Sequence, residues 1–123
     1  MSFVEDFRGA LAPVGLPCAQ GRYTGEAPSY LVFNYTATPA FSADDAVQYV
    51  RIGWMLHLFM PPEEDPTALQ GRILQALAAG GYDCPAREDA SEEGAVHIVY
   101  ELESVVTADE FQGAGAGRSD PGL

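Results

Sequence analysis

A chain of 123 residues is long enough for one domain with a hydrophobic core and short for two. Its 18 acidic residues against 6 basic ones give a formal net charge of -12. That balance argues against a protein that wraps a nucleic-acid backbone, because such a protein needs cations to neutralise phosphates. No apolar run of about 18 residues predicts a membrane-spanning helix, and we expect no secretory signal because the first residues lack its basic and apolar segments.

The two cysteines, Cys18 and Cys84, could form a disulfide bond or remain free thiols. Two cysteines in an intracellular chain are usually free thiols, so we expect them to be reduced. The sequence has no C-x-x-C motif and no cysteine–histidine spacing suited to zinc. It therefore predicts no metal site and no bound cofactor.

The N-terminal segment predicts a short helix followed by a loop. Ser2 is followed three residues later by a glutamate, which is the spacing of a capping box. Phe3, Phe7 and Leu11 then form one apolar stripe, and a proline and a glycine end the helix. Residues 14–28 are rich in glycine and proline and predict a loop with a short extended piece.

Two long runs of alternating residues predict neighbouring β-strands. The first covers residues 29–37 and is ended by Pro39, and the second covers residues 48–60. Residues 40–46 between them are too many for a two-residue turn and predict an extended arm anchored by Phe41. One face of the second run is entirely apolar and consists of Val50, Ile52, Trp54, Leu56 and Leu58.

A second helix and two further strands complete the predicted domain. Asp65 and the proline after it mark the start of the helix, and two glycines after residue 79 mark its end. A short strand over residues 82–87 and a long one over residues 96–105 follow. The predicted fold is therefore α+β: a mixed, mostly antiparallel sheet packed with two helices. The side chains of these later elements that we expect to be buried are Leu69, Ile73, Ala76, Leu77, Val96, Ile98, Tyr100 and Leu102.

The composition changes near the C-terminus. Residues 107–123 are rich in glycine and alanine, and they cannot bury enough apolar area to offset the entropy lost on ordering. We therefore expect one domain over residues 1–106. The Gly-rich tail over residues 107–123 is expected to be flexible unless assembly orders it.

The sequence offers little that suggests catalysis. No serine has a nucleophile-elbow motif, and the acidic pairs fall in expected loops and at a helix start, where solvation accounts for them. His57 and His97, both on predicted strands, could meet across the sheet and form a pH-sensitive or metal site, but their spacing implies no third ligand. We expect no catalytic residue and no enzyme activity.

Four stretches, in this order, resemble a known family. Residues 28–35 are PSYLVFNY, and residues 41–45 are FSADD with the strand YVRI at residues 49–52. A helix over residues 69–77 precedes Gly-Gly-Tyr, and residues 99–102 are VYEL. Together they resemble the strand, loop, helix and closing-strand motifs of siphophage tail terminator (tail completion) proteins.

The resemblance implies a virion structural protein of the tail or neck that assembles in the host cytoplasm. Six copies would form a ring on the head-proximal end of the tail tube, end its polymerisation and join it to the head. The implied partners are further copies of the chain, the tail tube protein and a head–neck connector protein. DNA would pass through the acidic lumen without specific binding, and no membrane is involved.

The same resemblance, taken with the second face of the residue 48–60 strand, marks candidate contacts between subunits or with the tube. These residues are Phe41, Asp44, Asp45, Tyr49, Arg51 and Met55.

Two other functions fit the sequence. One is another head–tail connector, such as a head-closure (neck) protein. The other is a small acidic cytosolic binding or inhibitor module that mimics nucleic acid, which predicts a monomer with its carboxylates gathered on one face.

Overall fold

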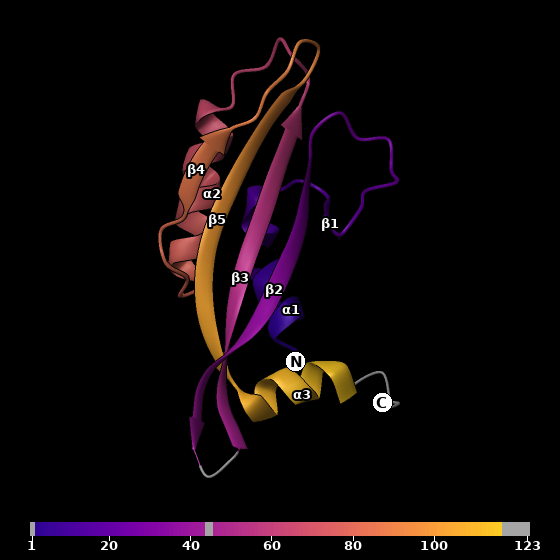
Figure 1. The fold of residues 1–123 in the computed structure, drawn as a ribbon. Helices are drawn as coiled ribbons and strands as arrows, with labels where there is room; N and C mark the ends of the chain where they lie inside the picture. The colour runs from indigo at the N-terminus through magenta and orange to yellow at the C-terminus, as the bar shows by residue number, and fades with distance from the viewer. Residues whose placement is uncertain (1, 44–45, 117–123) are drawn as a thin grey trace.

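A computed structural model of the chain describes residues 2–43 and 46–116. It confirms the predicted α+β class: a five-stranded, mostly antiparallel sheet carries its helices on one side (Figure 1). The helices are α1 (Phe3–Ala10), the 3-10 turn η1 (Ala12–Val14), α2 (Thr67–Ala79) and α3 (Ala108–Ala116). The strands are β1 (Cys18–Gln20), β2 (Tyr30–Ala43), β3 (Ala46–Met60), β4 (Ala86–Asp89) and β5 (Val96–Thr107).

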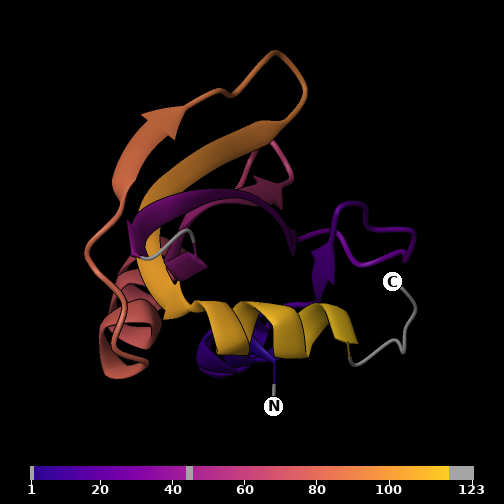
Figure 2. The same ribbon diagram turned by 60° about the horizontal axis from the view of Figure 1, so that its bottom comes forward.

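Strand β3 lies at the centre of the sheet, whose strand order is β1-β2-β3-β5-β4. β2 runs antiparallel to β3 along its whole length, and β5 pairs with β3 from Tyr49 opposite Thr107 to Met60 opposite Val96. β1 is parallel to β2 and contacts only its first residues. Figure 2 shows the strands curling around the side of the sheet that carries α1.

The core lies between the sheet and the helices, where the predicted apolar faces meet. The rings of Phe7 and Trp54 stack with centroids 3.9 Å apart, and both side chains are buried. Ile73 and Leu77 of α2 complete the same cluster. The indole Nε1–H of Trp54 donates a hydrogen bond to Ser104 Oγ at 2.9 Å, so the buried ring leaves no unpaired polar atom.

The ends of the first two helices follow the expected capping chemistry with one shift. Ser2 Oγ accepts a hydrogen bond from the backbone N–H of Glu5 at 3.1 Å, as the capping box predicts. α2 begins one residue later than expected, because Pro66 occupies the N-cap position. Asp65 still caps the helix: its Oδ1 accepts hydrogen bonds from the backbone and hydroxyl of Thr67.

β2 does not end at Pro39, so that prediction is wrong. The strand continues to Ala43, and β3 begins at Ala46. The carbonyl of Phe33 accepts from Gly21, so the odd-numbered residues of β2 direct their backbone groups away from β3. Pro39 therefore lies where its missing N–H would face an open edge, and no hydrogen bond of the β2–β3 ladder is lost.

The short fourth strand also differs from its predicted position over residues 82–87. β4 comprises Ala86–Asp89, directly after Pro85, which has no N–H to donate. Tyr82, four residues before β4, instead packs edge-on against Phe7, with ring centroids 5.2 Å apart. The segment between α2 and β4 thus contributes the Tyr82 side chain to the hydrophobic core.

Residues 108–116, which lie within the tail expected to be flexible, form α3. Glu110 N–H donates to Thr107 Oγ1, and Glu110 Oε1 accepts from Thr107 N–H, which together make a capping box. Phe111 stacks on Phe3 with centroids 5.6 Å apart and so joins the core. The sequence TADE at residues 107–110 has the spacing of a capping box. The glycines after it, which disfavour a helix, led the sequence analysis to overlook this helix start.

Replacing Phe7 by alanine should lower the free energy of unfolding by about 3–5 kcal/mol, because it leaves a cavity against Trp54. Urea unfolding followed by circular dichroism measures this. Phe59→Ala, on the opposite face of the sheet and only half-buried, is the matched control and should cost less than half as much. Equal losses would show that the core is not where the structure places it.

Candidate functional site

The side of the sheet away from the helices carries no covering element in the described part of the chain (Figure 1). We call it the uncovered face. On β2 and β3 it comprises Tyr30, Val32, Asn34, Thr36, Thr38, Tyr49, Arg51, Gly53, Met55, His57 and Phe59. On β5 it comprises His97, Val99, Glu101, Glu103, Val105 and Thr107.

Three of the predicted contact residues lie together on this face. Tyr49, with 44% of its surface exposed, Arg51 and Met55, with 38%, follow one another at every second or fourth position of β3. Val105 lies opposite Arg51 on β5 and is 56% exposed, more than any other large apolar side chain whose burial the structure describes. Sequence analysis gave Val105 no role, although its position in the alternation of the last strand was readable.

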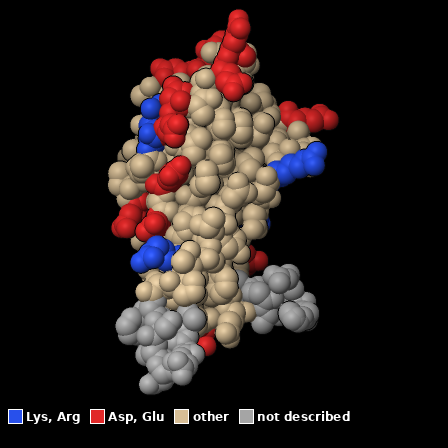
Figure 3. Space-filling model, in the orientation of Figure 1, with Lys and Arg blue, Asp and Glu red and all other residues tan. Residues whose placement is uncertain are grey.

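Charge on the uncovered face is unevenly spread. Figure 3 shows acidic groups, with basic groups among them, along the side formed by β4 and β5, and further acidic groups at the upper end of the molecule, while the middle over β2 and β3 is largely uncharged. Arg51 Nε lies 3.8 Å from Glu103 Oε1, and both side chains are exposed. An ion pair of this kind contributes little to stability, so Arg51 is available to a partner.

The β2–β3 hairpin extends beyond the rest of the sheet (Figure 1). We call residues 41–48, past the last β3–β5 pair, the hairpin arm. The backbone of Phe41 is opposite Tyr49, and no third strand pairs with the described residues of this arm. Asp44 and Asp45 lie outside the described residues.

The other end of the uncovered face carries a row of stacked rings. Tyr23 stacks on Tyr30 at 4.4 Å, Tyr30 on Phe59 at 5.1 Å, and Phe59 on His97 at 4.3 Å between centroids. Sequence analysis missed Tyr23, which lies in the loop before β2 and has no periodic signal. The row gives this end of the face an apolar surface without help from the helices.

The two histidines do meet across the sheet, as the sequence allowed. His57 Nδ1 and His97 Nε2 are 2.9 Å apart, so one nitrogen carries a proton that the other accepts. Burial, and then repulsion from His97, lower the pKa of His57 below its usual value. The described residues contain no group of three or more His, Cys, Asp or Glu side chains that could hold a metal ion.

This pair predicts a loss of stability in mild acid. The folded pKa of His57 is lowered, so the unfolded chain binds more protons and the free energy of unfolding falls with pH below about 6.5. Urea unfolding at several values between about pH 7.5 and 5.5 should show this fall. His57→Gln should flatten it, and an unchanged slope in that variant would contradict the assignment.

The two thiols differ in surroundings and are free in the structure. Cys18 is partly buried, and burial raises its pKa to about 11, while nearby Arg8 lowers it by less. Cys84 is exposed.

Iodoacetamide should therefore modify Cys84 first, because the thiolate is the nucleophile and Cys18 is both shielded and protonated at neutral pH. Mass spectrometry of peptides over a time course measures both rates. Urea should abolish the difference. Equal rates in the folded protein would contradict the burial of Cys18.

No described helix is long and apolar enough to cross a membrane.

Comparison with known proteins identifies the fold and no family. No protein-family model matches the chain, and no curated protein matches it in sequence. Six chains of solved structures match. One of them, which has no functional name, has a TM-score of 0.53 and 16% identity, covering 81% of this chain and 85% of that chain. A likeness at this identity concerns the fold alone.

Proposed function

We propose that this chain is a virion structural protein, a tail terminator that forms a six-membered ring on the head-proximal end of a phage tail tube. The ring ends tube polymerisation and makes the joint through which DNA passes. The observation that carries the proposal is the hairpin arm, which leaves the core and contains the stretch that resembles the loop motif of that family.

The arm is difficult to account for in an isolated monomer. A two-stranded hairpin with no further cover is marginally stable in water. β3 has 15 residues, against a mean strand length of about 5–6. A strand that long, extended past its own core, gains stability when a neighbouring chain packs against it. The four family-like stretches fall on β2, the arm with β3, α2 and β5.

Open strand edges on opposite sides of the sheet favour head-to-tail assembly. β1 pairs only with Leu31–Phe33 of β2, and β4 pairs only with Ile98–Glu101 of β5. Beyond these, residues 34–43 and 102–107 each have one strand neighbour in the described chain. An unpaired edge is a template for another chain, and two different edges that join head-to-tail generate a ring when the rotation closes.

The charge of the chain suits passage of DNA better than binding of it. Six copies would together carry a strong negative charge, since each chain has a net charge of -12. Acidic groups along β4 and β5 would repel phosphates and prevent tight contact (Figure 3). The viewed face lacks the continuous acidic surface that a nucleic-acid mimic needs. The expected protein partners are the tail tube protein and a head–neck connector.

Electron microscopy of tail tubes tests the proposal. The purified chain is added to polymerising tail tube protein encoded beside it, and tube ends and lengths are recorded by negative staining. We expect one end of each tube to carry a ring and the tubes to stop growing. Tubes that keep growing with bare ends in excess folded chain would contradict the proposal, as would binding to the head connector alone.

Val105→Glu should prevent ring formation without unfolding the chain. Its side chain is exposed at the open edge of β5, where a carboxylate would have to lose its water when a neighbouring copy packs against that edge. Thermal unfolding should stay within about 3 °C of the parent, since exposed substitutions cost little. The matched control is Ala78→Glu, which adds the same charge to an exposed position of α2. It should leave ring formation on tail tubes intact.

A further inference from the structure

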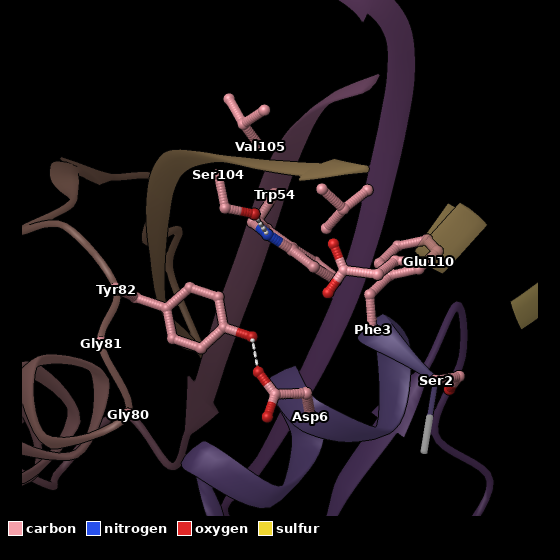
Figure 4. A pocket seen from close by; sticks show the side chains of 11 residues that line it. Ser2, Phe3, Asp6, Trp54, Gly80, Gly81, Tyr82, Ser104, Val105 and Glu110 are labelled. Atoms are coloured by element: carbon pink, nitrogen blue, oxygen red, sulfur yellow. Dashed lines mark hydrogen bonds between the residues drawn. The ribbon is translucent and has the colours of Figure 1, made fainter. Parts of the chain in front are cut away.

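A pocket of about 350 Å³ opens on the helix side of the sheet (Figure 4). Five elements or their flanking segments supply its wall: α1, β3, the turn after α2, β5 and α3. Its distinctive side chains are Phe3, Asp6, Trp54, Tyr82, Ser104 and Glu110.

The wall of the pocket is aromatic. The rings of Phe3 and Trp54 lie 5.9 Å apart, and Tyr82 stands perpendicular to Trp54 with centroids 6.5 Å apart. Trp54 and Phe3 are buried, with Phe7 stacked on the indole and Phe111 on Phe3, so the half-buried Tyr82 is the ring of this wall that a cation can reach. Ser104, which accepts the Trp54 indole hydrogen, adds a hydroxyl at the inner end.

Two carboxylates from different helices face this wall. Asp6 Oδ2 accepts a hydrogen bond from Tyr82 Oη at 2.7 Å, and Glu110 Oε1 accepts from the backbone of Thr107 at 2.8 Å. Each carboxylate is thus held in place by one oxygen and keeps its second oxygen for another donor. Among the described residues, none that lines the pocket is basic.

The C-terminal end of α2 adds to the negative electrostatic potential in the pocket. Gly80 caps the C-terminus of that helix and Gly81, with φ of 88°, turns the chain away from it. A helix C-terminus carries partial negative charge from its last carbonyl groups. The two carboxylates, the helix end and the partly exposed ring of Tyr82 therefore all favour a positive group at one place.

We infer that this pocket binds the guanidinium group of an arginine side chain on a basic partner protein. A planar guanidinium stacks on aromatic rings and donates to two acceptors at once, whereas an ammonium is a compact, strongly hydrated charge. The volume admits one long side chain. A second copy of this chain is a poor donor, because each copy brings a net charge of -12. The inference does not depend on ring formation.

The pocket contains a built-in probe, since Trp54 is the one tryptophan of the chain. Three acetylated, amidated Gly-X-Gly peptides are titrated into the folded protein, with arginine, lysine or the neutral isostere citrulline at X. Tryptophan fluorescence and amide NMR shifts record binding. We expect saturable binding of the arginine peptide, at least threefold weaker binding of lysine, and no saturable change with citrulline.

Two variants place the binding site. Asp6→Asn and Glu110→Gln keep an oxygen acceptor for Tyr82 and Thr107, so the fold is retained while the charge is lost. Each should weaken the arginine peptide at least fivefold. Glu26→Gln, in the loop before β2, removes the same charge elsewhere and should change binding less than twofold.

Four results would overturn the inference. They are equal responses to arginine and citrulline, tighter binding of lysine, equal losses in Glu26→Gln and Asp6→Asn, and no saturable response to the arginine peptide. None of them bears on capping of tail tubes, which microscopy measures separately. A pocket that binds arginine in a protein that fails to cap tubes would leave this inference standing and remove the proposed function.

Discussion

The register of β3 is the constraint on which the rest of the structure depends. β3 is the central strand, and from Val50 to Met60 its even-numbered side chains point toward the helices while its odd-numbered ones point away. Trp54 thereby meets Phe7 and fixes α1 on the sheet, and the same alternation exposes Tyr49 and Met55 on the other side. A slip of one residue would exchange the two faces, so the core and the uncovered face are specified together.

The same strand links the parts that we assign to function. At one end β3 enters the hairpin arm, near its middle it supplies Trp54 to the arginine pocket, and at the far end His57 and Phe59 meet His97. The helices cover one side only, because each contributes a single apolar stripe. The partner contacts that we propose therefore involve the uncovered face, the open edges of β2 and β5, and the pocket that Trp54 lines.

Sequence patterns predicted those parts of the fold that local chemistry controls. The sequence alone showed the alternation over residues 48–60, the helix cap at Ser2 and the helix end after Ala79. These features were enough to predict the α+β class. Pro39 misled because its effect depends on which way its backbone faces, which only strand pairing decides. The arginine pocket could not be predicted, because it joins Asp6, Trp54 and Glu110 from distant parts of the chain.

Hydrogen–deuterium exchange in the free and the tube-bound protein tests the central claim, that open strand edges join neighbouring copies. Odd-numbered residues of β2 and β5 direct their backbone groups outward, and those of Tyr35, Ala37 and Val105 have no strand partner in the described chain. Our account predicts fast exchange at these amides in the free protein and slow exchange after tail tubes are added. Equally fast exchange in fully bound protein would contradict it.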